Sequence, residues 1–165
     1  MPAKNDFNIV TLTNNDGCFD LQFRKDSRHE RTNSPTYYRW KAQFVVTCPK
    51  KNIKFLKKIQ SALNCGQVGV SKDQARFSVQ KISDVAGIVV PFFKKNPLSQ
   101  NKKKDFALWS KAVEIIQKNK GKYLSEWKKN DICSLIEIHK SCAKYKKRAS
   151  HPKWFDMAKE LSRTK

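Results

Sequence analysis

The chain has 165 residues, with 35 Lys or Arg against 14 Asp or Glu, which gives a formal net charge of +21. That excess is larger than solubility requires, so it predicts a polyanionic partner, and a sequence pI near 10.0 is typical of nucleic-acid-binding proteins. A hydrophobic content of 39% excludes a chain that is disordered throughout, and no stretch approaches the roughly 18 apolar residues of a membrane span.

The periodicity of apolar residues divides most of the chain into helices and strands. Apolar residues that recur every three or four positions predict a helix, and apolar residues that alternate with polar ones predict a strand. In chain order we expect a helix at 5–14, strands at 18–25 and 38–47, a helix at 50–64, strands at 66–71 and 75–80, and helices at 83–93 and 102–119. Gly17 is expected to end the first helix in the left-handed conformation.

This order of elements, α-β-β-α-β-β-α followed by more helices, predicts an α+β fold with one curved antiparallel sheet and helices on one of its faces. We assign residues 1–122 to this core domain and residues 123–165 to a basic helical C-terminal extension. The extension is expected to form one or two helices, the second of which begins at Pro152.

Each predicted strand has apolar side chains on one face and mainly basic or amide side chains on the other. Arg and Lys can read guanine bidentately and Gln can read adenine, so such a face suits the major groove of DNA. The alternative is a plain solvated face, and the net charge favours the groove. The residues predicted to contact nucleic acid are Gln22, Arg24, Arg39, Lys41, Gln43, Lys72, Arg76, Ser78 and Gln80.

Residues 9–17 read Ile-Val-Thr-Leu-Thr-Asn-Asn-Asp-Gly and run straight into the first predicted strand. This segment resembles the LAGLIDADG motif, a helix that ends in an acid and a glycine. Further segments follow in the order typical of that family, among them Phe44-Val-Val-Thr, Leu63-Asn-Cys-Gly, Val90-Pro-Phe-Phe and Lys102-Lys-Lys-Asp-Phe. The resemblance covers roughly residues 7–145, and it rests on the order of these segments taken together.

The resemblance implies a homing endonuclease in which two motif helices pack together and bring two acids to one place. There the acids and nearby carbonyls hold Mg²⁺ against a scissile phosphate. Carried onto this sequence, Asp16 is catalytic and a metal ligand, Gly17 contributes to the metal site, and Lys102 is the basic catalytic residue beside it. One motif per chain implies a homodimer. The residues expected at its interface are Phe7, Val10, Thr11 and Asn14.

Four positions depart from the family pattern. Val10 and Thr11 stand where the pattern has small residues, above all a glycine, and a β-branched side chain keeps two helices further apart. Cys48 stands where the family often has a polar residue that positions water, a task that suits a thiol poorly. Asn14 replaces the common first acid of the motif.

Two functions therefore remain open from the sequence. The first is a homodimeric, Mg²⁺-dependent endonuclease that cuts double-stranded DNA and is encoded within an organellar intron, in a mitochondrion or chloroplast. The second is a non-catalytic relative that binds structured RNA, as an intron maturase or as a structural component of a ribonucleoprotein. The basic C-terminal extension suits either partner.

Overall fold

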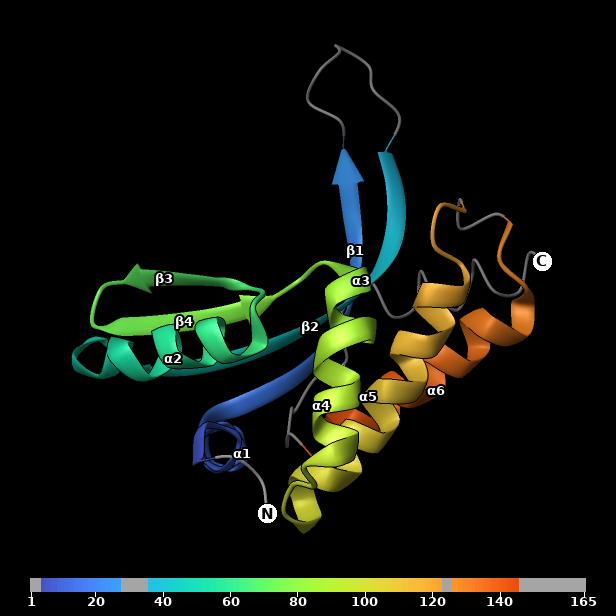
Figure 1. Cartoon of the computed structure of the whole chain (residues 1–165). Coiled ribbons are helices and arrows are strands. Elements are labelled where there is room, and N and C mark those ends of the chain that lie inside the picture. Colours follow the sequence, from blue (N-terminus) through green and yellow to red (C-terminus); the bar gives the residue numbers. More distant parts are fainter. Residues whose placement is uncertain (1–3, 28–35, 123–125, 146–165) are drawn as a thin grey trace.

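A computed structural model describes residues 4–27, 36–122 and 126–145 of the chain (Figure 1). They form an α+β fold with a four-stranded antiparallel sheet in the order β1-β2-β4-β3. The predicted α+β fold class and the predicted order of the first elements are both confirmed. Within the described residues, no helix is long and apolar enough to cross a membrane.

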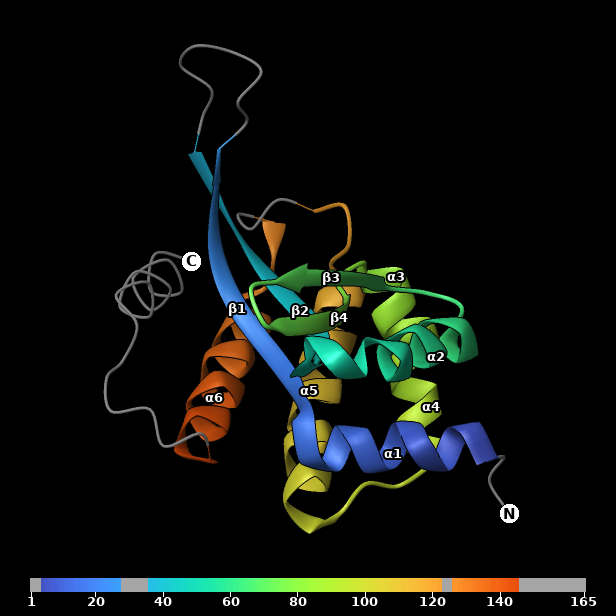
Figure 2. The ribbon, with the colours of Figure 1, turned by 90° about the vertical axis from the view of Figure 1, so that its left-hand side faces the viewer.

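The first half of the sheet is one long ribbon. α1 (Lys4–Asp16) continues without a linker into β1 (Gly17–Ser27), which pairs antiparallel with β2 (Thr36–Pro49). Both strands are longer than the alternation predicted. In Figure 2 the ribbon runs as one bent ladder, with α1 at its lower end. The pairing places the start of β1 beside the C-terminal half of β2, since Gly17 pairs with Val46.

The prediction that Gly17 is left-handed is wrong. Among the described glycines, positive φ angles occur at Gly66 and Gly121, and Gly17 is already the first residue of β1. The helix therefore ends because the chain enters the sheet. A glycine is needed at position 17 because the residue there packs tightly against Thr13 in the last turn of α1.

The rest of the sheet and its covering helices follow the predicted order. The elements are η1 (Lys50–Asn52), α2 (Ile53–Leu63), β3 (Gln67–Ser71), β4 (Gln74–Val79), α3 (Ile82–Asp84), the π-helical η2 (Val85–Val89), α4 (Val90–Lys95), α5 (Gln100–Lys118) and α6 (Lys129–Tyr145). α3, η2 and α4 run on as one helical segment, which begins at Ile82, one residue before the helix predicted at 83–93. The helix predicted from Pro152 lies outside the described residues.

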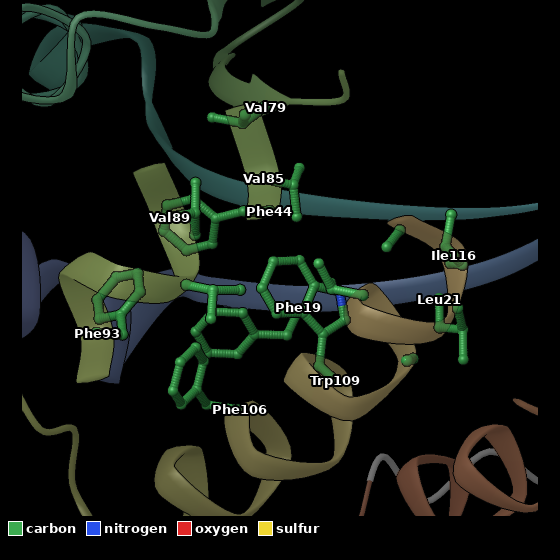
Figure 3. Packing of buried hydrophobic residues seen from close by; sticks show 14 of the residues in the cluster. Phe19, Leu21, Phe44, Val79, Val85, Val89, Phe93, Phe106, Trp109 and Ile116 are labelled. Atoms are coloured by element: carbon green, nitrogen blue, oxygen red, sulfur yellow. The ribbon is translucent and has the colours of Figure 1, made fainter. Parts of the chain in front are cut away.

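An aromatic cluster between the sheet and the helices forms the centre of the core (Figure 3). The ring of Phe19 in β1 lies 5.4 Å from Phe44 in β2, 5.5 Å from Phe93 in α4 and 5.0 Å from Trp109 in α5, measured between centroids. Aromatic pairs at such separations add to the stabilisation that burial provides. Phe19 thus joins two strands and two helices that are distant in the sequence.

The burial of alternate residues determines which face of the sheet is free. On β1 and β2 the side chains predicted to face the core are all buried, namely Phe19, Leu21, Phe23, Trp40, Ala42, Phe44 and Val46. Successive strand side chains point to opposite faces, so the intervening polar residues lie on the other side. We call this second side of β1, β2 and β4 the outer face.

Phe44→Ala is expected to lower the free energy of unfolding by about 3–5 kcal/mol, because it opens a cavity in a well-packed core. Phe44 is fully buried and contacts Phe19, Phe77 and Phe93. The matched control is Phe55→Ala, since Phe55 is 37% exposed. Urea unfolding of the three proteins measures the difference, and equal losses from the two variants would contradict this account of the core.

Candidate active site and nucleic-acid interface

The junction of α1 and β1 carries the acid that the sequence singled out. Asp16 is the last residue of α1, and its side chain is exposed. Gly17 is the first residue of β1 and is buried. The carboxylate therefore projects at the point where the helix meets the sheet, and the backbone beside it is fixed by strand pairing.

Gly17 is required by a close approach. A Cβ atom built on it would lie 2.7 Å from both the Cγ2 atom and the carbonyl oxygen of Thr13. Thr13 is itself fully buried, and its hydroxyl donates to the carbonyl of Ile9 at 2.8 Å. Because a backbone carbonyl cannot rotate away from a new methyl group, only glycine lets β1 pack against the last turn of α1.

Lys102 meets the same junction from the other end of the domain. Its Nζ donates to the carbonyl oxygen of Gly17, although 85 residues separate the two in the sequence. At the residue that precedes α5, the backbone N–H of Ser99 donates to the Oδ1 atom of Asn14 at 2.9 Å. The predicted residues Asp16, Gly17 and Lys102 are therefore brought together by the attachment of α5 to α1.

Cys48 lies near this junction on the core side of β2. Burial, and after it the negative charge of Asp16, raise the pKa of the Cys48 thiol above its ordinary value. The thiol consequently stays protonated at neutral pH, and the electrostatic effect shows that Asp16 is close by. Cys48 is 6% exposed, so the position offers a neutral, covered sulfur instead of a polar group facing solvent.

The oxygen atoms at the junction are of the kind that a hard cation prefers. Mg²⁺ takes carboxylate and carbonyl oxygens and keeps several waters, and Asp16 and Gly17 offer one of each. Across the part of the chain that the structure describes, no group of three or more His, Cys, Asp or Glu side chains could hold a metal ion. The carboxylate of Asp16 and the carbonyl of Gly17 are therefore chemically compatible with a magnesium ion.

Polar side chains on the outer face of the sheet are joined by hydrogen bonds. Lys41 Nζ donates to Gln80 Oε1 at 2.7 Å, and Gln80 Nε2 donates to Ser78 Oγ at 3.4 Å. Nearer to α1, the Oδ2 atom of Asp20 accepts from Gln22 Nε2 at 2.5 Å and from Gln43 Nε2 at 2.9 Å. The structure thus gathers most of the residues predicted to contact nucleic acid.

The remaining predicted contact residues differ in their exposure. Arg39 and Arg76 are exposed on β2 and β4, and Lys72 is exposed in the turn between β3 and β4, with φ of 54°. The backbone of Arg24 lies in β1 opposite Arg39, but its side chain lies outside the described part. Gln43 is only 6% exposed, so in this conformation it supports its neighbours and does not face solvent.

Asp20 is a polar residue of this face that the prediction omitted. It alternates with Gln22 on β1, and the same pattern that selected Gln22 could have found it. Its acidic side chain does not fit the pattern of basic and amide side chains from which contact with nucleic acid is predicted.

The residues predicted at the dimer interface differ in their exposure and in their contacts within the chain. Thr11 is exposed, whereas Val10 is half-buried and packs against the core of its own chain. Asn14 is engaged by Ser99 within the chain. The side chain of Phe7 lies outside the described part. The interface itself stays a prediction.

Residues 9–113 match the family described as LAGLIDADG endonuclease. The chain is also 29% identical over 108 residues to a protein of Mycosarcoma maydis named "Probable intron-encoded DNA endonuclease 1". That alignment covers 65% of this chain and 36% of the relative, so most of the relative has no counterpart here.

Solved structures share the fold. I-SmaMI, bound to an uncleaved DNA target in the presence of calcium, superposes with a TM-score of 0.74 at 18% identity, over 93% of this chain and 48% of its own. The homing endonuclease I-TnaI matches with a TM-score of 0.67 at 19% identity, over 99% of both chains. I-CpaMI, bound to uncleaved DNA, has a TM-score of 0.71 at 20% identity and is covered over 50% of its length. At these identities the likeness is one of fold.

Gly17→Ala is expected to lower the free energy of unfolding by about 1–3 kcal/mol, the typical cost of overpacking. The added methyl group would meet the side chain and the carbonyl of Thr13. Gly87→Ala is the matched control, because a Cβ there would meet nothing within 4 Å and alanine is favoured in a helix. Thermal unfolding compares the two, and a Gly17→Ala protein as stable as the Gly87→Ala protein would refute the close contact.

Proposed function

Because the chain belongs to the LAGLIDADG endonuclease family, we propose that it cuts double-stranded DNA at a specific site as a Mg²⁺-dependent homodimer. The observation that carries the proposal is the arrangement at the α1–β1 junction, where Asp16 precedes Gly17 and the carbonyl of Gly17 accepts from the ammonium of Lys102. The DNA-bound state of I-SmaMI and I-CpaMI supports DNA as the first partner to test.

Within the proposed site, Asp16 and the carbonyl of Gly17 would hold the metal ion. The chemistry that Mg²⁺ supplies at such a site is activation of water and stabilisation of the departing oxygen. Lys102 reaches the junction through its contact with the Gly17 carbonyl, and with a metal ion on that oxygen its ammonium would turn to the scissile phosphate and add positive charge there. Lys102 and Asp16 are thereby given separate tasks, one electrostatic and one in metal binding.

A homodimer follows from the shortage of ligands in one chain. One copy offers a single motif acid, and a two-fold dimer would bring a second Asp16 to the same place. The exposed surface of α1 around Thr11 is the surface we propose for the contact, together with Phe7, Val10 and Asn14. Two outer faces related in this way would read a long, pseudo-palindromic site.

A duplex is proposed to lie along the ribbon of β1 and β2 on the outer face. The major groove is about 12 Å wide and admits a two-stranded ribbon. The ribbon is long enough to follow the groove, because the 14 residues of β2 span roughly 45 Å. Arg39, Lys41 and Arg76 supply positive charge on this face.

The alternative is a non-catalytic relative that binds structured RNA. The neutral, buried thiol of Cys48 beside Asp16 favours it, since that thiol cannot position water as a polar side chain would. Val10 and Thr11 favour it as well, because they weaken the close helix pairing that the enzyme needs. In either case we propose that the gene lies in an organellar intron, which the name of the Mycosarcoma maydis relative supports.

Asp16→Asn is expected to reduce Mg²⁺-dependent cleavage of the gene's own insertion site to background while leaving DNA affinity nearly unchanged. The substitution keeps the size of the side chain and removes the charge that holds the metal. Gel analysis of cleaved duplex and fluorescence anisotropy measure the two properties. Asp73→Asn is the control, since Asp73 is exposed in the turn between β3 and β4.

One result would overturn the enzyme, and another would overturn the homodimer. One is failure of the unaltered protein to cut that site in Mg²⁺, which would favour the RNA-binding alternative. The other is a protein that cuts although it remains a monomer in sedimentation at working concentration, since a single chain lacks the second acid.

The joint replacement of Arg39, Lys41 and Arg76 by Ala is expected to flatten the dependence of DNA affinity on salt. Each phosphate contact that is lost reduces the slope of log K against log[salt] by about 0.9. The matched control replaces Lys54, Lys57 and Lys58 on α2, which packs against the other side of the sheet. Equal slopes for the two triple variants would locate the duplex away from the outer face.

A further inference from the structure

The outer face of the ribbon carries an acidic side chain, although a negative charge repels the polyanion that this face is proposed to bind. Among the described side chains on the outer faces of β1 and β2, Asp20 is the acid, and it lies opposite Gln43, two residues along β2 from Lys41. A carboxylate there weakens the general attraction to phosphates. Its presence therefore calls for a contact in which negative charge is an advantage.

Asp20 is held firmly on both sides of the sheet. On the outer face its Oδ2 atom accepts from Gln22 at 2.5 Å and from Gln43 at 2.9 Å, and the burial of Gln43 fixes that donor. On the core side the indole Nε1 of Trp109 donates to the backbone carbonyl of Asp20 at 3.0 Å. A side chain restrained in this way binds with little loss of conformational freedom.

The second carboxylate oxygen is available. Within the described residues, Asp20 Oδ1 has no hydrogen-bond partner, and it is not among the buried polar atoms that lack one. It can therefore accept a hydrogen bond from a ligand at the outer face. Both glutamine amides are directed at Oδ2, so the accepting direction of Oδ1 is left open.

Bases differ in whether they can donate to such an oxygen. In the major groove cytosine offers its N4 amino group and adenine its N6 amino group, whereas guanine and thymine present acceptors. We propose that Asp20 is a specificity-determining residue that selects cytosine through its N4 amino group and disfavours guanine and thymine. The inference deepens the proposed function and rests on it, because it requires duplex DNA on the outer face.

The fold also predicts which base pair is read. Asp20 follows Asp16 by four residues along the start of β1, a distance of about 10–13 Å at the rise of a strand. Along a duplex this corresponds to about three to four base pairs, at roughly 3.4 Å each. Asp20 should therefore act three to four base pairs from the phosphate beside Asp16, once in each half-site of a dimer.

The test is selection from a library of randomised double-stranded DNA. The full-length chain carries Asp16→Asn to prevent cleavage, and bound duplexes are sequenced. We expect one position in each half-site at which cytosine is enriched about tenfold over guanine, the size of one good base contact. Asp20→Asn leaves an amide N–H donor where the free oxygen was, so that position should change from cytosine to guanine, which presents acceptors there, and Asp20→Ala should make it indifferent.

A control variant and two contrary outcomes separate failure of the Asp20 assignment from failure of the proposed function. Glu114→Gln removes one negative charge from an exposed position on α5 and should leave every position unchanged. Thermal unfolding checks that both Asp20 variants fold. If folded Asp20→Asn selects the same bases as the parent protein, the assignment is overturned while the proposed function stands. If the parent protein enriches no duplex sequence at all, the proposed function fails, and the assignment fails with it.

Discussion

The attachment of α5 to β1 is the constraint on which the candidate site depends. Trp109 packs against Phe19 in the core, and its indole donates to the carbonyl of Asp20. About two turns earlier on the same helix, Lys102 donates to the carbonyl of Gly17. One rigid element therefore holds both the start of β1, where the proposed catalytic acid Asp16 projects, and the part of β1 that faces the proposed groove. Any shift of β1 against α5 would displace these two regions together.

Charge and geometry make separate contributions on the outer face. The net charge of +21 provides attraction to any nucleic acid and carries no sequence information. The hydrogen bonds among Lys41, Gln80, Asp20 and Gln43 fix where donors and acceptors lie before a ligand arrives. Such order lowers the conformational entropy that binding would cost, which is a requirement for reading bases rather than phosphates alone. A uniformly basic face would bind more strongly at random and discriminate less.

Much of the fold could be predicted from local patterns, and the errors share one cause. Alternation along β1 and β2 predicted the inward side chains, because a strand has a period of two whatever it pairs with. The conformation of Gly17 was predicted wrongly from the same local view. A glycine after a helix usually ends it in the left-handed region, whereas here the tight fit against Thr13 decides. Likewise, Gln43 is buried beside Asp20 of the neighbouring strand. The pattern of residues along β2 alone could not predict that burial.

The sequence by itself determined the positive charge from which a polyanionic partner is predicted, the α+β order of elements and the motif that ends in Asp16 and Gly17. These follow from composition, from periodicity and from a resemblance carried by short segments, all of which are local properties of the chain. Tertiary structure alone decided that Lys102 reaches the Gly17 carbonyl across 85 residues, that Cys48 lies in the field of Asp16, and that Asp20 is clamped with one oxygen free. Those outcomes depend on which elements pack side by side, and packing depends on the shapes of all the buried side chains at once.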